Sequence, residues 1–188
     1  PLRTTPGCYP AGGVYSDKTV PAVALTGQAA LNTGGDGQWP IIHSWNTKYY
    51  QIEAILDNTG VTGDAKALFE AAVRESFAFL HVTNAATEAD NFIASGNSLV
   101  NWDAAANKIQ LIITQKYFST VGLLPFEAWT DYRRTGFPAD IPFTMAANPG
   151  PSIPVRFRYP QTEYNYNPIN VQAEGDISPF TSRIFWDK

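Results

Sequence analysis

The sequence of 188 residues predicts a mainly α-helical fold with long irregular loops. Two observations lead to this prediction. Apolar residues between Ser44 and Arg134 recur at spacings of three and four, which is the period of a helix with one buried face. Prolines are dense after Phe137, and proline is excluded from the interior of regular elements. We therefore expect a single domain with a loop-rich part (1–43), a helical part (44–136) and an irregular tail (137–188).

The helical part is predicted to begin with an antiparallel hairpin of two helices. The first helix begins near Ser44 and presents one apolar face: Trp45, Tyr49, Ile52 and Leu56. Residues 58–60 supply a stop signal, and Asp64 is a good cap for the start of the second helix. The second buried face follows the same spacing: Phe69, Val73, Ser76, Phe77 and Leu80. A short glycine-containing turn between two such helices favours antiparallel packing.

Three more helices and the tail complete the predicted fold. We expect a short helix over 87–93, a longer one over about 103–121, and one that follows Pro125 and ends at Gly136. The proline-rich tail should wrap over the helices, because its apolar side chains need a surface to cover: Ile153, Val155, Phe157 and Tyr159. A single helix hairpin suggests the remnant of a helical-repeat scaffold.

Charge and composition exclude several kinds of partner. The net charge is −4 and the basic residues are scattered, so we expect no nucleic-acid partner. Cys8 is the only cysteine, which leaves no intrachain disulfide. No stretch approaches the roughly 20 apolar residues of a membrane span. Residues 1–8 lack the pattern of a signal peptide, and no apolar run precedes Cys8, so any lipid anchor is expected outside this chain.

The sequence offers little support for catalysis. Glu127 and Asp131 lie four residues apart on one helix face, and such a pair could act as general acid and base at a glycosidic bond. The adjacent Arg133 and Arg134 favour the alternative, a structural cluster of ion pairs. Neither histidine, His43 nor His81, belongs to a metal-binding spacing. We therefore expect no enzyme activity, no metal and no cofactor.

The candidate ligand-binding residues lie in and just after the loop-rich part. Glycines occupy positions 34, 35 and 37. They can lift the indole of Trp39 away from the helices, and Pro40 restricts Trp39 to extended backbone. An indole face packs well on the apolar C–H face of a sugar. The predicted residues are Trp39 for stacking, Tyr15 as a second stacking residue, and Asp36, Gln38 and Asn46 for hydrogen bonds to hydroxyl groups.

Two long motifs resemble those of the SusD/RagB family. The first comprises residues 115–117 followed by residues 127–138, from Glu127 to Pro138. The second comprises residues 156–165, with Asn167 and Asn170 after them. The closing residues 185–187 also fit the family pattern. Because both motifs occur in the family's order, the resemblance extends from about Tyr49 to Lys188.

The resemblance implies an outer-membrane lipoprotein exposed on the cell surface and built on a tetratricopeptide-like scaffold. Such proteins bind oligosaccharide, or in some members peptide, and deliver it to a TonB-dependent, SusC-like transporter. Family members are much longer, so this chain is expected to be the carboxy-terminal part of one. The motif residues are expected to serve the scaffold. An open alternative is a scaffold or transporter-interaction segment whose protein contacts ligand through its amino-terminal half.

We predict that Trp39→Ala weakens oligosaccharide binding without lowering the melting temperature. Loss of one stacked indole should cost about 1–2 kcal/mol of binding free energy. The alternative is that Trp39 packs against the helix hairpin. Calorimetry and thermal unfolding of the same variant separate the two, because a packing role lowers the melting temperature and leaves the affinity intact.

Overall fold

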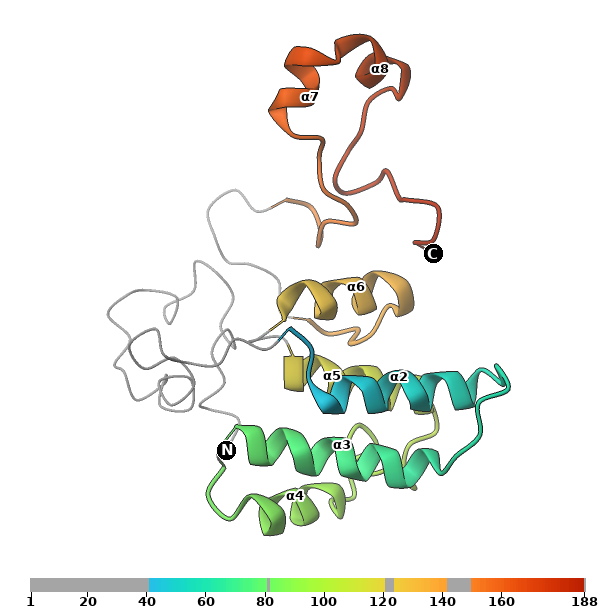
Figure 1. Cartoon of the computed structure of the whole chain (residues 1–188), viewed down its shortest axis with the longest axis vertical. Helices are drawn as coiled ribbons and strands as arrows, with labels where there is room; N and C mark the ends of the chain where they lie inside the picture. Colours follow the sequence, from blue (N-terminus) through green and yellow to red (C-terminus); the bar gives the residue numbers. More distant parts are fainter. Residues whose placement is uncertain (1–40, 81, 121–123, 142–149, 188) are drawn as a thin grey trace.

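The computed structural model describes residues 41–80, 82–120, 124–141 and 150–187 (Figure 1). These residues form seven α-helices and no strand, so the predicted mainly α-helical fold is confirmed. The helices are α2 (Ser44–Leu56), α3 (Ala65–Phe79), α4 (Ala85–Ile93), α5 (Lys108–Thr120), α6 (Pro125–Thr135), α7 (Gln161–Tyr166) and α8 (Pro168–Ala173). None of these helices combines the length and apolar character that a membrane crossing needs.

The predicted helix hairpin is formed by α2 and α3, which lie side by side (Figure 1). Asp64 caps α3, because its carboxylate accepts a hydrogen bond of 2.9 Å from the backbone N–H of Ala67. In the connecting turn Asn58 and Gly60 both have positive φ, of 52° and 87°. Asparagine and glycine tolerate this backbone conformation better than other residues, which explains why the chain turns here.

The core lies where α2, α3 and α5 meet. Its fully buried side chains come from all three helices: Tyr49, Ile52, Phe69, Leu111, Ile112 and Ile113. The rings of Tyr49 and Phe69 meet edge to face across the hairpin, with centroids 6.5 Å apart. Trp45 is also buried, as its place in the helical pattern predicts. The apolar stripes read from the sequence are therefore the core faces of these helices.

Helix α5 begins five residues later than predicted, at Lys108 instead of about 103. Two asparagines explain the difference. Asn101 accepts hydrogen bonds from the backbone N–H groups of Asp103 and Ala104, which closes a local turn. Asn107 then accepts a bond of 3.0 Å from the N–H of Gln110, and this cap sets the start of the helix.

Helix α6 is joined to the rest of the bundle by buried charges. Lys116 of α5 lies 2.6 Å from the carboxylate of Asp131 on α6, and their side chains are only 2% and 9% exposed. Arg134 pairs with Asp131 at 3.0 Å and also with Glu53 of α2. The Lys116 ammonium lies 3.9 Å from the ring centroid of Tyr50, a cation–π contact. This ionic cluster includes the arginine–carboxylate pair that the sequence predicts within the motif of residues 127–138.

The tail packs against α6 from the opposite side. The guanidinium of Arg133 lies over two indole rings. Its Cζ atom is 4.3 Å from the ring centroid of Trp129 and 4.5 Å from that of Trp186. Its guanidinium also pairs with the buried carboxylate of Asp187 at 3.5 Å. Helices α7 and α8 have six residues each and bury no side chain. In Figure 1 they lie beyond α6, on the side away from α5.

We predict that Asp131→Asn lowers the free energy of unfolding by about 3–5 kcal/mol, because it leaves the buried Lys116 ammonium without its ionic partner. Urea denaturation measures this loss. The matched control is Asp103→Asn, which breaks an ion pair of similar length between two exposed side chains, Lys66 and Asp103. The control should change stability little. Equal stability losses in the two variants would contradict a special role for the buried pair.

Candidate functional site

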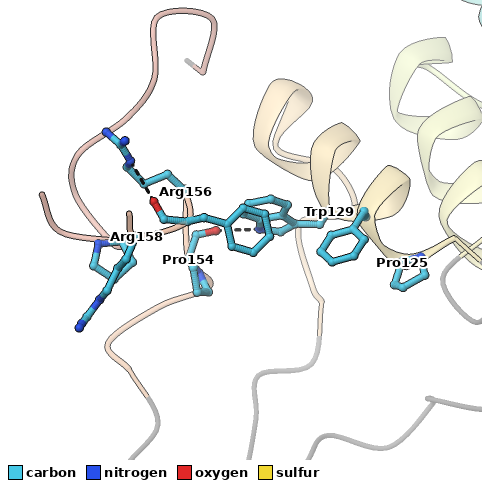
Figure 2. A pocket seen from close by; sticks show the side chains of 8 residues that line it. Pro125, Trp129, Pro154, Arg156 and Arg158 are labelled. Atoms are coloured by element: carbon cyan, nitrogen blue, oxygen red, sulfur yellow. Dashed lines mark hydrogen bonds between the residues drawn. The ribbon is translucent and has the colours of Figure 1, made fainter. Parts of the chain in front are cut away.

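A groove of about 380 Å³ lies between the first turn of α6 and the tail (Figure 2). We call it the aromatic groove and define it by the residues that line it: Pro125, Phe126, Trp129, Pro154, Arg156, Phe157, Arg158 and Pro179. Its walls are rings and proline side chains, and its charged members are two arginines. A concave, mostly apolar surface with a few polar groups is typical of small-molecule binding sites.

Helix α6 positions two of the rings. Pro125 occupies the first helical turn, where its fixed φ suits the helix and its missing N–H costs nothing. Phe126 and Trp129 follow three residues apart and therefore share one face of the helix. The ring of Phe157 comes from the tail. Its centroid lies 5.9 Å from the ring centroid of Phe126 and 4.9 Å from that of Trp129. Three aromatic rings from two distant segments thus meet in one place.

The tail is fastened to the groove by hydrogen bonds. The indole Nε1–H of Trp129 donates to the carbonyl of Pro154 at 2.8 Å (Figure 2). The backbone N–H of Val155 donates to the carbonyl of Pro179 at 2.7 Å. These bonds hold the tail in place, yet the rings of Phe126 and Phe157 stay 66% and 64% exposed. Large rings held in an ordered site and open to solvent are available to a ligand.

The two arginines stand at the end of the groove remote from Pro125. In Figure 2 their guanidinium groups diverge, that of Arg156 pointing upward and that of Arg158 downward. Arg156 donates from Nε to the carbonyl of Phe157 at 3.2 Å, and its guanidinium lies 5.6 Å from the ring centroid of Tyr159. Arg156 is half-buried, whereas Arg158 is exposed to solvent. No acidic residue belongs to the described lining.

None of the residues predicted from the sequence belongs to the described lining of the groove. Trp39, Tyr15, Asp36 and Gln38 fall outside the described residues, so their assignment stays a prediction. Asn46 is described: it lies on α2, is 1% exposed, and its side-chain amide has no hydrogen-bond partner among the described residues. Nearby, His43 stacks on Trp45 with ring centroids 4.1 Å apart, and burial lowers the pKa of His43.

The carboxylates considered for acid–base catalysis are engaged by the scaffold. Glu127 accepts a hydrogen bond of 2.7 Å from the hydroxyl of Tyr50. Burial raises the pKa of Tyr50 above its ordinary value, and the bond to Glu127 raises it further. Asp131 is held by Lys116 and Arg134. The ion-pair interpretation of this motif therefore fits the structure. In the described part of the chain, no three His, Cys, Asp or Glu side chains are grouped to hold a metal.

Four groove residues lie within the two family motifs, whose residues were expected to serve the scaffold: Trp129, Arg156, Phe157 and Arg158. One signal was present, since Phe126 and Trp129 have the i, i+3 spacing of a shared helix face. The third ring, Phe157, comes from the tail 28 positions after Trp129, and only the fold brings it to α6.

Comparison with known families identifies the chain. A family model of SusD-like proteins, described as starch-binding and associating with the outer membrane, matches residues 13–160. This range covers well over half of the 188 residues, and the chain belongs to the SusD-like family. No curated protein sequence gives a significant match to it.

Solved structures of SusD-like proteins share the fold. One, from Bacteroides vulgatus, is described as an outer-membrane protein involved in nutrient binding. It is 26% identical to this chain with a TM-score of 0.61, and the match covers 79% of this chain and 34% of the other protein. A SusD-like protein from Bacteroides thetaiotaomicron is 25% identical with a TM-score of 0.60, and the match covers 79% of this chain and 37% of that protein. A third SusD-like protein, from Bacteroidetes, is 25% identical with a TM-score of 0.61, and the match covers 80% of this chain and 30% of that protein. This chain thus spans about a third of the length of these structures.

We predict that Trp129→Phe loosens the tail while the bundle stays folded. The substitution keeps a ring but removes the donor to Pro154, a hydrogen bond worth about 1 kcal/mol. The amide of Val155 should then exchange with solvent about fivefold faster, which hydrogen exchange measures. The control is Trp102→Phe. Trp102 packs against the core residue Phe69, so this substitution should leave the exchange rate of the Val155 amide unchanged. Unaltered exchange at Val155 in Trp129→Phe would contradict the role of the indole.

Proposed function

We propose that this chain is part of a non-catalytic binding protein that holds an oligosaccharide in the aromatic groove at the outer-membrane surface. The observation that supports this most directly is the cluster of three rings, two of them largely exposed, in an ordered concave site. Membership of a family described as starch-binding and outer-membrane-associated supports the ligand class and the location.

Sugar recognition by such a groove has a simple physical basis. The C–H face of a pyranose ring is apolar and packs against an aromatic face, while its hydroxyl groups remain in water or bind polar neighbours. Each stacking contact is worth about 1 kcal/mol. Two or three contacts then correspond to very weak binding, with a Kd of roughly 10 mM, unless further groups contribute. Trp39, Tyr15, Asp36 and Gln38 remain proposed as such further contacts. The structure speaks against Asn46, whose side chain is buried in α2 and does not line the groove.

Weak capture suits the proposed second step, which is delivery of the oligosaccharide to a TonB-dependent, SusC-like transporter. A ligand that is held loosely can be released to a partner within a short time. In this proposal the protein stands on the extracellular face and is attached by a lipid anchor outside this chain. A peptide is the alternative ligand, because grooves lined by aromatic rings also bind extended peptides.

A second candidate function is that of a scaffold or transporter-interaction segment. The observation that favours it is apolar surface away from the groove: Phe185 is fully exposed, and Tyr166 and Ile169 are nearly so. Large apolar side chains that are exposed to solvent are available for contact with a protein partner. The test below separates the two functions, because an interaction segment need not bind any sugar.

We predict that Phe126→Ala weakens oligosaccharide binding about five- to tenfold, the loss expected for one aromatic contact. Calorimetric titration with a panel of neutral and acidic oligosaccharides identifies the best ligand, which is then measured against the variant. Because Phe126 is 66% exposed, its removal should leave the melting temperature nearly unchanged.

The matched control is Phe185→Ala, which removes an exposed ring outside the groove. It should bind the ligand like the unmodified chain. Equal affinity of Phe126→Ala and Phe185→Ala would remove the groove from the proposal. Binding of no member of the panel would favour the interaction segment instead.

A further inference from the structure

The described arginines fall into two groups. Four of them pair with carboxylates: Arg74 with Glu70 and Asp90, Arg133 and Arg183 with Asp187, and Arg134 with Glu53 and Asp131. The other two are Arg156 and Arg158, for which no carboxylate of the described residues lies within ion-pair distance. Both belong to the aromatic groove.

The contrast is notable because the chain as a whole is acidic, with a net charge of −4. Acidic partners are therefore plentiful, yet none is supplied to these two guanidinium groups by the described residues. Among the described residues, Arg156 makes one side-chain hydrogen bond, to the carbonyl of Phe157, whereas a guanidinium has five N–H donors. Glu127, the acidic neighbour of Phe126, is held by the hydroxyl of Tyr50.

We propose that the ligand of the aromatic groove is an acidic oligosaccharide, one whose sugar units bear carboxylates. This inference rests on the proposed function and adds the charge of the substrate to it. The rings of Phe126, Trp129 and Phe157 stack on the apolar sugar faces, while Arg156 and Arg158 bind the carboxylates of neighbouring units.

The chemistry of the two side-chain types supports this division. A guanidinium presents a planar fork of N–H donors that matches the two oxygens of a carboxylate. A neutral sugar offers only hydroxyl groups, which bind a guanidinium more weakly than a charged oxygen does. Because the two groups diverge in Figure 2, they suit carboxylates on separate units of a chain.

The sharpest test compares ligands that share their sugar rings and differ in the charge of the carboxyl group. The probes are uronic-acid oligosaccharides, oligogalacturonate and oligomannuronate, and their methyl esters, which keep the sugar rings and lose the negative charge. Calorimetry is run at low and at physiological salt. We expect the free acid to bind about tenfold more tightly than its ester at low salt, and the difference to shrink as salt screens the exposed charges.

Variants then assign the preference to the two arginines. The double variant Arg156→Gln/Arg158→Gln should lose about tenfold in affinity for the free acid and keep its affinity for the ester. The control is Arg74→Gln, which removes an arginine paired with Glu70 and Asp90 outside the groove and should leave both affinities unchanged. Melting temperatures verify that each variant is folded.

Three other outcomes are possible, and each contradicts a different statement. Equal binding of acid and ester contradicts the charge preference and leaves the proposed oligosaccharide function intact. A preference that persists in the double variant contradicts its assignment to Arg156 and Arg158. Binding of neither probe, nor of any neutral oligosaccharide, contradicts the proposed function itself and this inference with it.

Discussion

The position of helix α6 depends on the buried ion pair between Lys116 and Asp131. Either charge would cost several kcal/mol if the interior left it unpaired, so α6 stays where the two groups meet at 2.6 Å. Helical periodicity then determines what the other side of α6 presents. Phe126 and Trp129 lie on that side, facing Phe157 of the tail. The aromatic groove is thus a geometric consequence of a polar contact beneath the helix.

The two sides of α6 use charge differently. On the bundle side and under the tail, every guanidinium meets a carboxylate: Arg134 pairs with Asp131, and Arg133 with the buried Asp187. Those pairs fix the geometry of the scaffold, because each buried charge accepts few other arrangements. At the groove, Arg156 and Arg158 lack such partners among the described residues. Paired charges build the site, and we propose that the two arginines without a described carboxylate partner bind the ligand.

The helices could be predicted from the sequence because each apolar stripe has the helical period, as for Trp45, Tyr49 and Ile52 in α2. The start of α5 could not be predicted from periodicity, because it depends on the Asn107 side chain, which accepts a hydrogen bond from the backbone N–H of Gln110. The pairing of Lys116 with Asp131 was also missed, because the adjacent arginines offered that carboxylate a nearer partner in sequence. The groove escaped prediction because its rings come from segments that only tertiary packing brings together.

The most direct test of the groove follows the indole N–H signals of the protein by NMR during titration with an oligosaccharide. Trp129 lies in the groove with its Nε1–H bonded to Pro154, whereas Trp102 lies against Phe69 in the core and serves as the internal control. We expect the Trp129 indole signal to shift progressively with ligand concentration while that of Trp102 stays in place. A ligand that binds, as shown by calorimetry, and leaves the Trp129 signal unmoved would contradict the assignment of the groove as the binding site.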